Sequence, residues 1–178
     1  MKETILKILK LTVTLLIICA GVAAVLAGVN AITKDKIAAI QVEKTQQAIS
    51  QVLPDVSGLE QLTLSGDTGI VKSVYKADNG YAVEVAPNGF DGAVTMMVGI
   101  SDGKVTGISV ISHTETPGLG AVAAANNAKG EAFRSQFVGQ SGTLEIGNQI
   151  DAMSGATITS RAVVAGVNAA LEFVENLG

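Results

Sequence analysis

The feature that most constrains the fold is an uncharged, mostly apolar run of 23 residues, from Leu11 to Thr33. As an α-helix, a run of this length spans about 34 Å, which is enough to cross a hydrocarbon core of about 30 Å. The sequence therefore predicts a transmembrane helix over residues 11–33. With 178 residues in total, the chain has room for one modest domain besides this anchor.

The charges on either side of the run indicate its orientation. Three lysines precede it within residues 1–10, whereas residues 34–36 follow it with a mixed Lys-Asp-Lys balance. Because positively charged flanks stay inside, we expect a single pass through the cytoplasmic membrane, with residues 1–10 in the cytoplasm and the large domain on the outer face. The alternative is a cleaved signal peptide ending near residues 25–27. The length of the run favours a retained anchor.

The remaining composition argues against several classes of function. Residues 34–178 carry 9 Lys and Arg against 15 Asp and Glu, which argues against nucleic acid as a partner. The one cysteine, Cys19, lies inside the expected span, so no disulfide can form within the chain and no thiolate cluster is available for a metal. The single histidine, His113, argues against a histidine-based metal or haem site. We expect no metal site, and any redox cofactor must be organic.

Residues 34–54 keep a helix-forming composition after the anchor, and no Gly or Pro interrupts them before Pro54. We expect this segment to continue the helix out of the membrane as a stalk. A flexible linker is the alternative. Pro54 ends the helical pattern, and from Leu59 the pattern changes to short β-rich runs. We therefore expect an extracytoplasmic domain after the stalk, over residues 55–178.

Two β-hairpins are predicted inside this domain. Residues 70–75 and 81–85 flank an Asp-Asn-Gly turn, and residues 94–100 and 105–111 flank an Asp-Gly turn. The nearly all-apolar run over residues 94–100 predicts a central strand of an antiparallel sheet.

Helical elements are expected after the second hairpin. Residues 121–128 have the composition of a short helix, and Phe133 and Phe137 would anchor a loop to the core. An apolar pattern of helical period closes the chain up to Leu177. The predicted fold class is α+β, with a twisted antiparallel sheet and helices packed against it behind the transmembrane helix.

The segment Asp151-Ala-Met-Ser-Gly-Ala-Thr157 comes directly before this last helical pattern. The small residues before Thr157 let the backbone approach another molecule closely. Thr157 would lie at or just before the helix N-terminus, where unpaired N–H groups and the positive end of the helix dipole favour an anion such as phosphate. The alternative is an ordinary helix cap formed by Ser154, Thr157 and Thr159.

The pattern Asp151-x-x-Ser-Gly-Ala-Thr157 resembles the flavinylation motif of a family of FMN-binding domains. This family includes the G subunit of the Rnf electron-transport complex and the C subunit of the sodium-pumping NADH:quinone reductase. In the family, a separate flavin transferase draws FMN from FAD and attaches it through its phosphate to the last threonine of the motif. The resemblance implies covalent FMN on Thr157, with Ser154, Gly155 and Ala156 beside it.

A second segment, His113-Thr-Glu-Thr-Pro-Gly-Leu-Gly120, resembles a loop of the same family without a departure. Its glycines let backbone amides meet a flat ring, its leucine offers an apolar face, and its polar side chains offer hydrogen bonds to the edge of an isoalloxazine. The residues expected to contact the cofactor are Glu115, Thr116, Gly118, Leu119 and Gly120. The alternative is that the polar side chains only satisfy the backbone of their own loop. For His113 we expect a structural hydrogen bond.

The resemblance implies a membrane-anchored flavoprotein electron carrier without a substrate site or catalytic residue of its own. It would relay electrons within an Rnf-type ferredoxin:NAD ion-translocating complex, with other membrane redox subunits and the flavin transferase as partners. One alternative is a stand-alone flavinylated carrier for extracellular electron transfer. Another is a membrane-tethered binding module without redox function. The glycines of residues 118–123 mimic a dinucleotide-binding fingerprint, but the preceding strands form hairpins rather than βαβ units.

Overall fold

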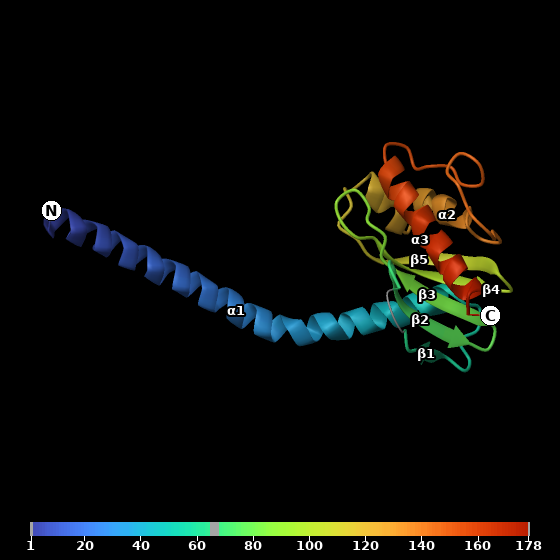
Figure 1. Ribbon diagram of the computed structural model, residues 1–178, viewed down its shortest axis with the longest axis horizontal. Helices are drawn as coiled ribbons and strands as arrows, with labels where there is room; N and C mark the ends of the chain where they lie inside the picture. The colour runs from blue at the N-terminus through green and yellow to red at the C-terminus, as the bar shows by residue number, and fades with distance from the viewer. Residues whose placement is uncertain (1, 65–67, 178) are drawn as a thin grey trace. The chain divides into compact units, whose positions relative to one another are not determined.

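The computed structural model describes residues 2–64 and 68–177. The chain divides into two compact units, Met1–Glu43 and Lys44–Gly178. The first helix, α1 (Lys2–Val52), forms the first unit and enters the second (Figure 1).

The described residues of unit Met1–Glu43 all belong to α1, and the apolar side chains described there are exposed, as Leu11, Leu16 and Ile32 illustrate. In the described part of the chain, one helix is long and apolar enough to cross a membrane, over Leu6–Val52. An exposed apolar surface of this size is unfavourable in water and suits a hydrocarbon environment.

Unit Lys44–Gly178 is built on one antiparallel sheet whose five strands lie side by side in chain order (Figure 1). Each strand pairs with the next one along the chain, so the sheet is a meander. The strands are β1 (Glu60–Leu62), β2 (Val71–Ala77), β3 (Gly80–Val85), β4 (Thr95–Ser101) and β5 (Lys104–Ser112).

Both predicted hairpins are confirmed. Residues 78–79 connect β2 to β3, where Ala77 pairs with Gly80. Residues 102–103 connect β4 to β5, and Asp102 and Gly103 both have positive φ, at 51° and 71°. This is the turn geometry that matches the twist of two paired strands and that favours an Asp-Gly sequence. The apolar strand β4 lies inside the sheet, between β3 and β5.

One face of the sheet is covered by the last helix, α3 (Thr157–Glu175), and by the helix α2 (Ala128–Ser135). The fully buried side chains Val83, Met96 and Val98 of the sheet pack here against Val163 and Val167 of α3. The fold class is therefore α+β, as predicted. Because α3 lies across the sheet, its first turn is held in place by this core.

The opposite face of the sheet is covered by the end of α1. Ala48, Ile49 and Val52 are buried there against Ala82 and Met97 of the sheet. The compact unit thus begins at Lys44, earlier than residue 55, where we expected the domain to start. The last turns of the expected stalk are a layer of the domain itself.

Two paired glycines let the end of α1 approach the sheet closely. Gly99 of β4 pairs with Gly107 of β5, and a Cβ atom on Gly99 would lie 2.2 Å from the carbonyl oxygen of Val52. That same oxygen accepts a hydrogen bond from the hydroxyl of Thr106.

The connection between the sheet and α3 differs from the expectation. Instead of a helix over residues 121–128, the chain forms a short 3-10 helix, η1 (Gly120–Ala124), and then α2. Phe133 lies in α2 rather than in a loop, and its ring meets that of Phe137 edge-on at 5.4 Å. Asn127 begins α2, because its side chain accepts hydrogen bonds from the N–H groups of Lys129 and Gly130.

Candidate functional site

Thr157 is the first residue of α3, as predicted, and its side chain is exposed. No side chain caps this helix, so the alternative of an ordinary cap is not what the structure contains. In the described part of the chain, the Thr157 hydroxyl makes no hydrogen bond, and the N–H groups of Thr157, Ile158 and Thr159 have no acceptor before the helix. The first turn therefore keeps donors available for an anion.

Ser160 holds the turn that precedes α3. Its buried hydroxyl accepts a hydrogen bond from the N–H of Met153 at 2.9 Å and donates one to the carbonyl oxygen of Ala156 at 2.9 Å. Gly155 adopts φ +74° inside this turn, a conformation that favours glycine. Sequence reasoning did not single out Ser160. Its spacing of four residues after Ala156, one helical turn, is the signal that indicates this contact.

Glu115 is 4% exposed and holds three segments together. One carboxylate oxygen accepts hydrogen bonds from the N–H groups of Phe90, at 2.8 Å, and Asp91, at 3.2 Å. The other accepts a hydrogen bond at 2.5 Å from the hydroxyl of Thr159 in α3. Both oxygens are therefore engaged by groups outside the 113–120 loop, the backbone of residues 90–91 and the hydroxyl of Thr159.

Two glycines make room for this carboxylate. A Cβ atom on Gly89 would lie 2.2 Å from one oxygen of Glu115, and a Cβ atom on Gly120 would lie 2.3 Å from the other. Any side chain at either position would displace the carboxylate and the segments that it connects. The need for a glycine at position 120 thus has a cause inside the protein, the close approach of the Glu115 carboxylate.

Hydrogen bonding keeps Glu115 ionised. Burial on its own would raise the pKa of Glu115, but the hydrogen bonds from Thr159, Asp91 and Phe90, with the nearby His113, lower it below the ordinary value of 4.5. The buried Nδ1 of His113 has no hydrogen-bond partner in the described part of the chain, so the structure adds no role for this residue beyond its charge near Glu115.

The two sequence motifs meet at a cavity of about 320 Å³ beside Thr157. Three apolar side chains at its edge are unusually exposed: Phe90 by 68%, Ile158 by 53% and Leu119 by 44%. We call these three residues the apolar shelf. Such a cluster marks a surface that binds something. The lining residues are Phe90, Glu115, Thr116, Leu119, Gly120, Gly155, Ala156, Thr157, Ile158 and Thr159.

Seven of the nine residues expected at the cofactor site line this cavity, whereas Gly118 and Ser154 do not. Arg161 is exposed and lines a different cavity, together with Leu144 and Glu145. Phe90 and Ile158 were not singled out from the sequence. An isolated aromatic residue in a glycine-rich loop carries no signal of its own, because only the fold brings it beside Leu119.

The cavity combines a free hydroxyl with unpaired N–H donors, but its described lining offers no general base. The Thr157 hydroxyl is free and lies at unpaired N–H donors, and the apolar shelf offers a surface for a flat ring. Among the described residues that line the cavity, the only ionisable group is Glu115, and both its oxygens are engaged. No lining residue is therefore placed to take the hydroxyl proton, so attachment of a group would need an external catalyst.

Residues 89–172 match the family described as the FMN-binding domain, and both motifs lie within this range. The chain is 34% identical to the G subunit of the ion-translocating oxidoreductase complex of Methanosarcina acetivorans, over 94% of this chain and 95% of that protein. It is also 34% identical to the G subunit of the Na(+)-translocating ferredoxin:NAD(+) oxidoreductase complex of Acetobacterium woodii, over 96% of this chain and 93% of that protein.

A shorter match, 40% identical over 58% of this chain and 60% of the relative, is to the G subunit of the proton-translocating ferredoxin:NAD(+) oxidoreductase complex of Clostridium ljungdahlii. The fold, the site and these relatives define the chain as a flavoprotein with an FMN-binding domain. It belongs to the family of the G subunits of ion-translocating oxidoreductase complexes.

Proposed function

We propose that this protein is a membrane-anchored electron carrier in an ion-translocating ferredoxin:NAD oxidoreductase complex, with FMN attached through its phosphate to Thr157. The observation that carries the proposal is the exposed, unbonded hydroxyl of Thr157 in the first turn of α3, beside the apolar shelf. The names of the relatives support the assignment to such a complex.

The residues around Thr157 suit the separate parts of FMN. The N–H groups of residues 157–159 would hold the phosphodiester, and the apolar shelf would cover one side of the isoalloxazine and exclude water from it. When bound, the flavin supplies the redox chemistry by accepting and releasing electrons. The linkage leaves the ring system unmodified, so the protein tunes it through hydrogen bonds and burial.

A covalent tether is physically reasonable in this location. A flavin held only by contacts, with a Kd of about 1 μM, would be lost by dilution outside the cell. An effective concentration of about 1 mM at the tether contributes about 4 kcal/mol toward keeping the site filled. Because no lining residue activates Thr157, we assign its modification to a separate flavin transferase.

The attachment is tested by intact-mass measurement after co-expression with a flavin transferase. We expect an FMN-sized increment on the unsubstituted protein and none on Thr157→Ala. Thr143→Ala is the matched control, because Thr143 is also an exposed threonine but lies outside both motifs, and it should keep the increment. An increment that survives in Thr157→Ala would move the bond to another residue. No increment on the unsubstituted protein would leave a binding module without flavin.

The membrane placement is tested with single cysteines in a Cys19→Ser background. We propose that residues 11–33 cross the cytoplasmic membrane with residues 1–10 inside. A membrane-impermeant maleimide should then label Gln61→Cys in intact cells and label Lys7→Cys only after lysis. The reverse pattern would invert the topology. Labelling of neither variant until lysis would place the domain in the cytoplasm.

Co-purification distinguishes a member of the complex from a stand-alone carrier. We expect the flavinylated protein, extracted from membranes in mild detergent, to bring the other subunits of the complex with it. A flavinylated protein that purifies alone would favour the stand-alone carrier.

A further inference from the structure

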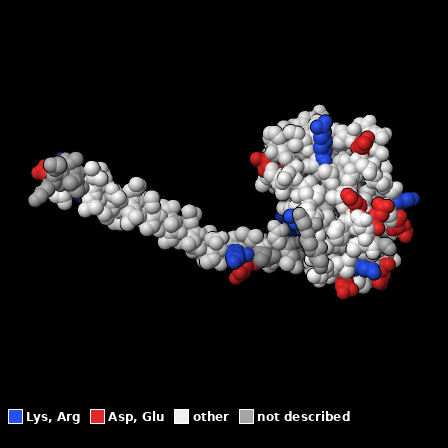
Figure 2. All heavy atoms as spheres, viewed as in Figure 1, with Lys and Arg blue, Asp and Glu red and all other residues white. Residues whose placement is uncertain are grey.

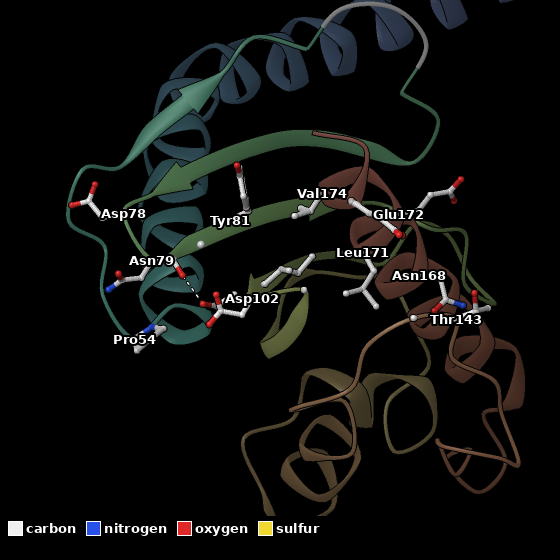
Figure 3. A pocket seen from close by; sticks show the side chains of 16 residues that line it. Pro54, Asp78, Asn79, Tyr81, Asp102, Thr143, Asn168, Leu171, Glu172 and Val174 are labelled. Atoms are coloured by element: carbon white, nitrogen blue, oxygen red, sulfur yellow. Dashed lines mark hydrogen bonds between the residues drawn. The ribbon is translucent and has the colours of Figure 1, made fainter. Parts of the chain in front are cut away.

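A second large cavity of the domain lies away from Thr157, at the other end of α3. It has a volume of about 1080 Å³ and is bordered by the C-terminal part of α3, the two hairpin turns and residues 142–143 (Figure 3). Because a helix rises about 1.5 Å per residue, the 19 residues of α3 separate its two ends by about 28 Å. This cavity, which we call the distal groove, is therefore not part of the site at Thr157.

Four acidic residues and no basic residue line the distal groove, and the side chains of Asp78 and Glu172 point away from its apolar residues toward the outside (Figure 3). Asp78 and Asp102 come from the hairpin turns, and Glu172 and Glu175 come from α3. None of the four forms an ion pair or a side-chain hydrogen bond within the described part of the chain. Figure 2 shows several acidic side chains, with basic ones among them, on the side of the domain where α3 ends. The residues that line the groove therefore carry four negative charges and no positive one.

Two of these carboxylates are placed where they oppose helix stability. The C-terminal end of a helix carries a partial negative charge, so acidic side chains in the last turn are unfavourable and basic ones are favourable. The last turn of α3 contains no basic residue, and Glu172 and Glu175 lie in it. Both side chains are exposed, so a basic partner that binds here would meet charges that the helix end itself does not stabilise.

The floor of the distal groove is apolar. Leu171 and Val174 of α3 lie across from Tyr81 of β3 (Figure 3). Tyr81 and Val174 are only half-buried, so part of this apolar surface is open to a ligand. An acidic rim above an apolar floor matches a protein segment that carries basic side chains on either side of an apolar one.

We propose that the distal groove docks a basic, amphipathic segment of another subunit of the complex. The proposal rests on the proposed function, because it takes the occupant from the same complex. Two other occupants fit poorly. Anionic lipid headgroups would be repelled by the carboxylates. A metal ion has no site here, because no group of three or more His, Cys, Asp or Glu among the described residues is able to hold one.

Docking at this groove would hold the domain by the end of α3 that is remote from the flavin. The apolar shelf and Thr157 would then stay accessible to redox partners while the domain remains bound. The surface that docks the domain would then be separate from the surface that exchanges electrons. A carrier that meets both an electron donor and an electron acceptor needs this separation.

The test is site-specific photo-crosslinking in membranes that contain the whole complex. p-Benzoylphenylalanine replaces Thr143, which is exposed in the groove, or Asn148, which is exposed and does not line it. After irradiation, mass spectrometry identifies the crosslinked segment. We expect an adduct from position 143 to a subunit segment that carries at least two Lys or Arg residues, and a much weaker adduct from position 148.

Matched charge variants test the electrostatic part. Glu172→Gln with Glu175→Gln should lower the yield of the position-143 adduct about five- to tenfold, since each rim charge contributes modestly. Glu131→Gln with Glu145→Gln changes the net charge equally at sites outside the groove and should leave the yield unchanged. Raised salt should weaken the adduct of the unsubstituted protein.

The outcomes separate this proposal from the proposed function. If the complex co-purifies but position 143 gives no adduct, an adduct to a segment without basic residues, or equal yields in both charge variants, the docking proposal fails and the proposed function stands. If the unsubstituted protein brings no other subunit with it, the membership of the complex fails, and the docking proposal fails with it.

Discussion

The loop His113–Gly120 is held in place by a single carboxylate, and this dependence can be measured. Glu115 accepts three hydrogen bonds in a nearly fully buried position, so Glu115→Gln would leave at least one donor without an acceptor. We expect a loss of about 1–3 kcal/mol in the free energy of unfolding, measured with urea. Glu131→Gln, on the exposed side of α2, should change it by less than about 0.5 kcal/mol. Equal effects would contradict the role assigned to Glu115.

The contribution of Glu115 to stability should depend on pH in a defined direction. Its pKa in the folded protein lies below the ordinary value of 4.5, so the folded state favours the ionised form. The stabilisation is therefore present above pH 4.5 and is lost as the pH falls through the folded pKa. The difference in unfolding free energy between the unsubstituted protein and Glu115→Gln should shrink on acidification. A difference that grows below pH 4.5 would reverse the sign of this linkage.

At the residue scale, the local sequence pattern predicted where a residue lies in its helix, but it did not predict hydrogen-bond partners. The apolar period after Ala156 correctly placed Thr157 at the start of a helix. The partners of Glu115 were not predictable, because Phe90 and Asp91 lie 24–25 residues away in a loop without a periodic signal. Hydrogen bonds between distant loops depend on the packed fold and leave no mark in the adjacent sequence.

Among the elements, the contact between α1 and the sheet is sensitive to one methyl group. A Cβ atom on Gly99 would lie 2.2 Å from the carbonyl oxygen of Val52, whereas one on Gly107 would lie 3.4 Å from the Val52 Cα. We expect Gly99→Ala to destabilise the domain by about 1–3 kcal/mol, as overpacking does in a well-packed core, and Gly107→Ala to have a smaller effect. Thermal unfolding of the two variants compares them directly. If Gly107→Ala is the more damaging, the end of α1 does not lie where the structure has it.

The strands were more predictable than the short helices. Each hairpin combines alternating apolar residues with a turn sequence, and these two signals agree with each other. The eight residues of α2 form little more than two helical turns, which is too short for a clear apolar periodicity. The main indication of this helix in the sequence is its N-cap residue, Asn127. An element of this length is determined by the packing of Phe133 on the core rather than by its own periodicity.

For the molecule as a whole, the position of the domain boundary predicts how the chain can be shortened. A protein that begins at Lys44 keeps the last turns of α1, whereas one that begins at Asp55 loses them and exposes Met97 and Ala82. We expect the first to be soluble and cooperatively folded. The second should lose several kcal/mol of apolar burial and aggregate, which gel filtration and thermal unfolding will detect. Equal stability of the two would show that residues 44–54 are not part of the domain.

The sequence contained an unused indication of this boundary. The run over residues 94–100 is nearly all apolar, and a strand of this kind is buried on both faces, so a second layer has to cover the sheet. The helical segment that ends at Val52 was the remaining candidate for that layer. Its apolar positions were correctly predicted to be helical, but helical period alone does not show which surface they cover.

The order of the strands along the sheet has a consequence for when Thr157 becomes available. Because each strand pairs with its predecessor, contacts within the sheet are mostly local, and such a sheet can assemble stepwise and quickly. By contrast, α3 docks on β2, β3 and β4, which precede it by more than fifty residues. The turn that presents Thr157 is therefore complete only after the rest of the domain has formed. A modifying enzyme that recognises this turn would act on finished molecules and would pass over chains still being synthesised or misfolded.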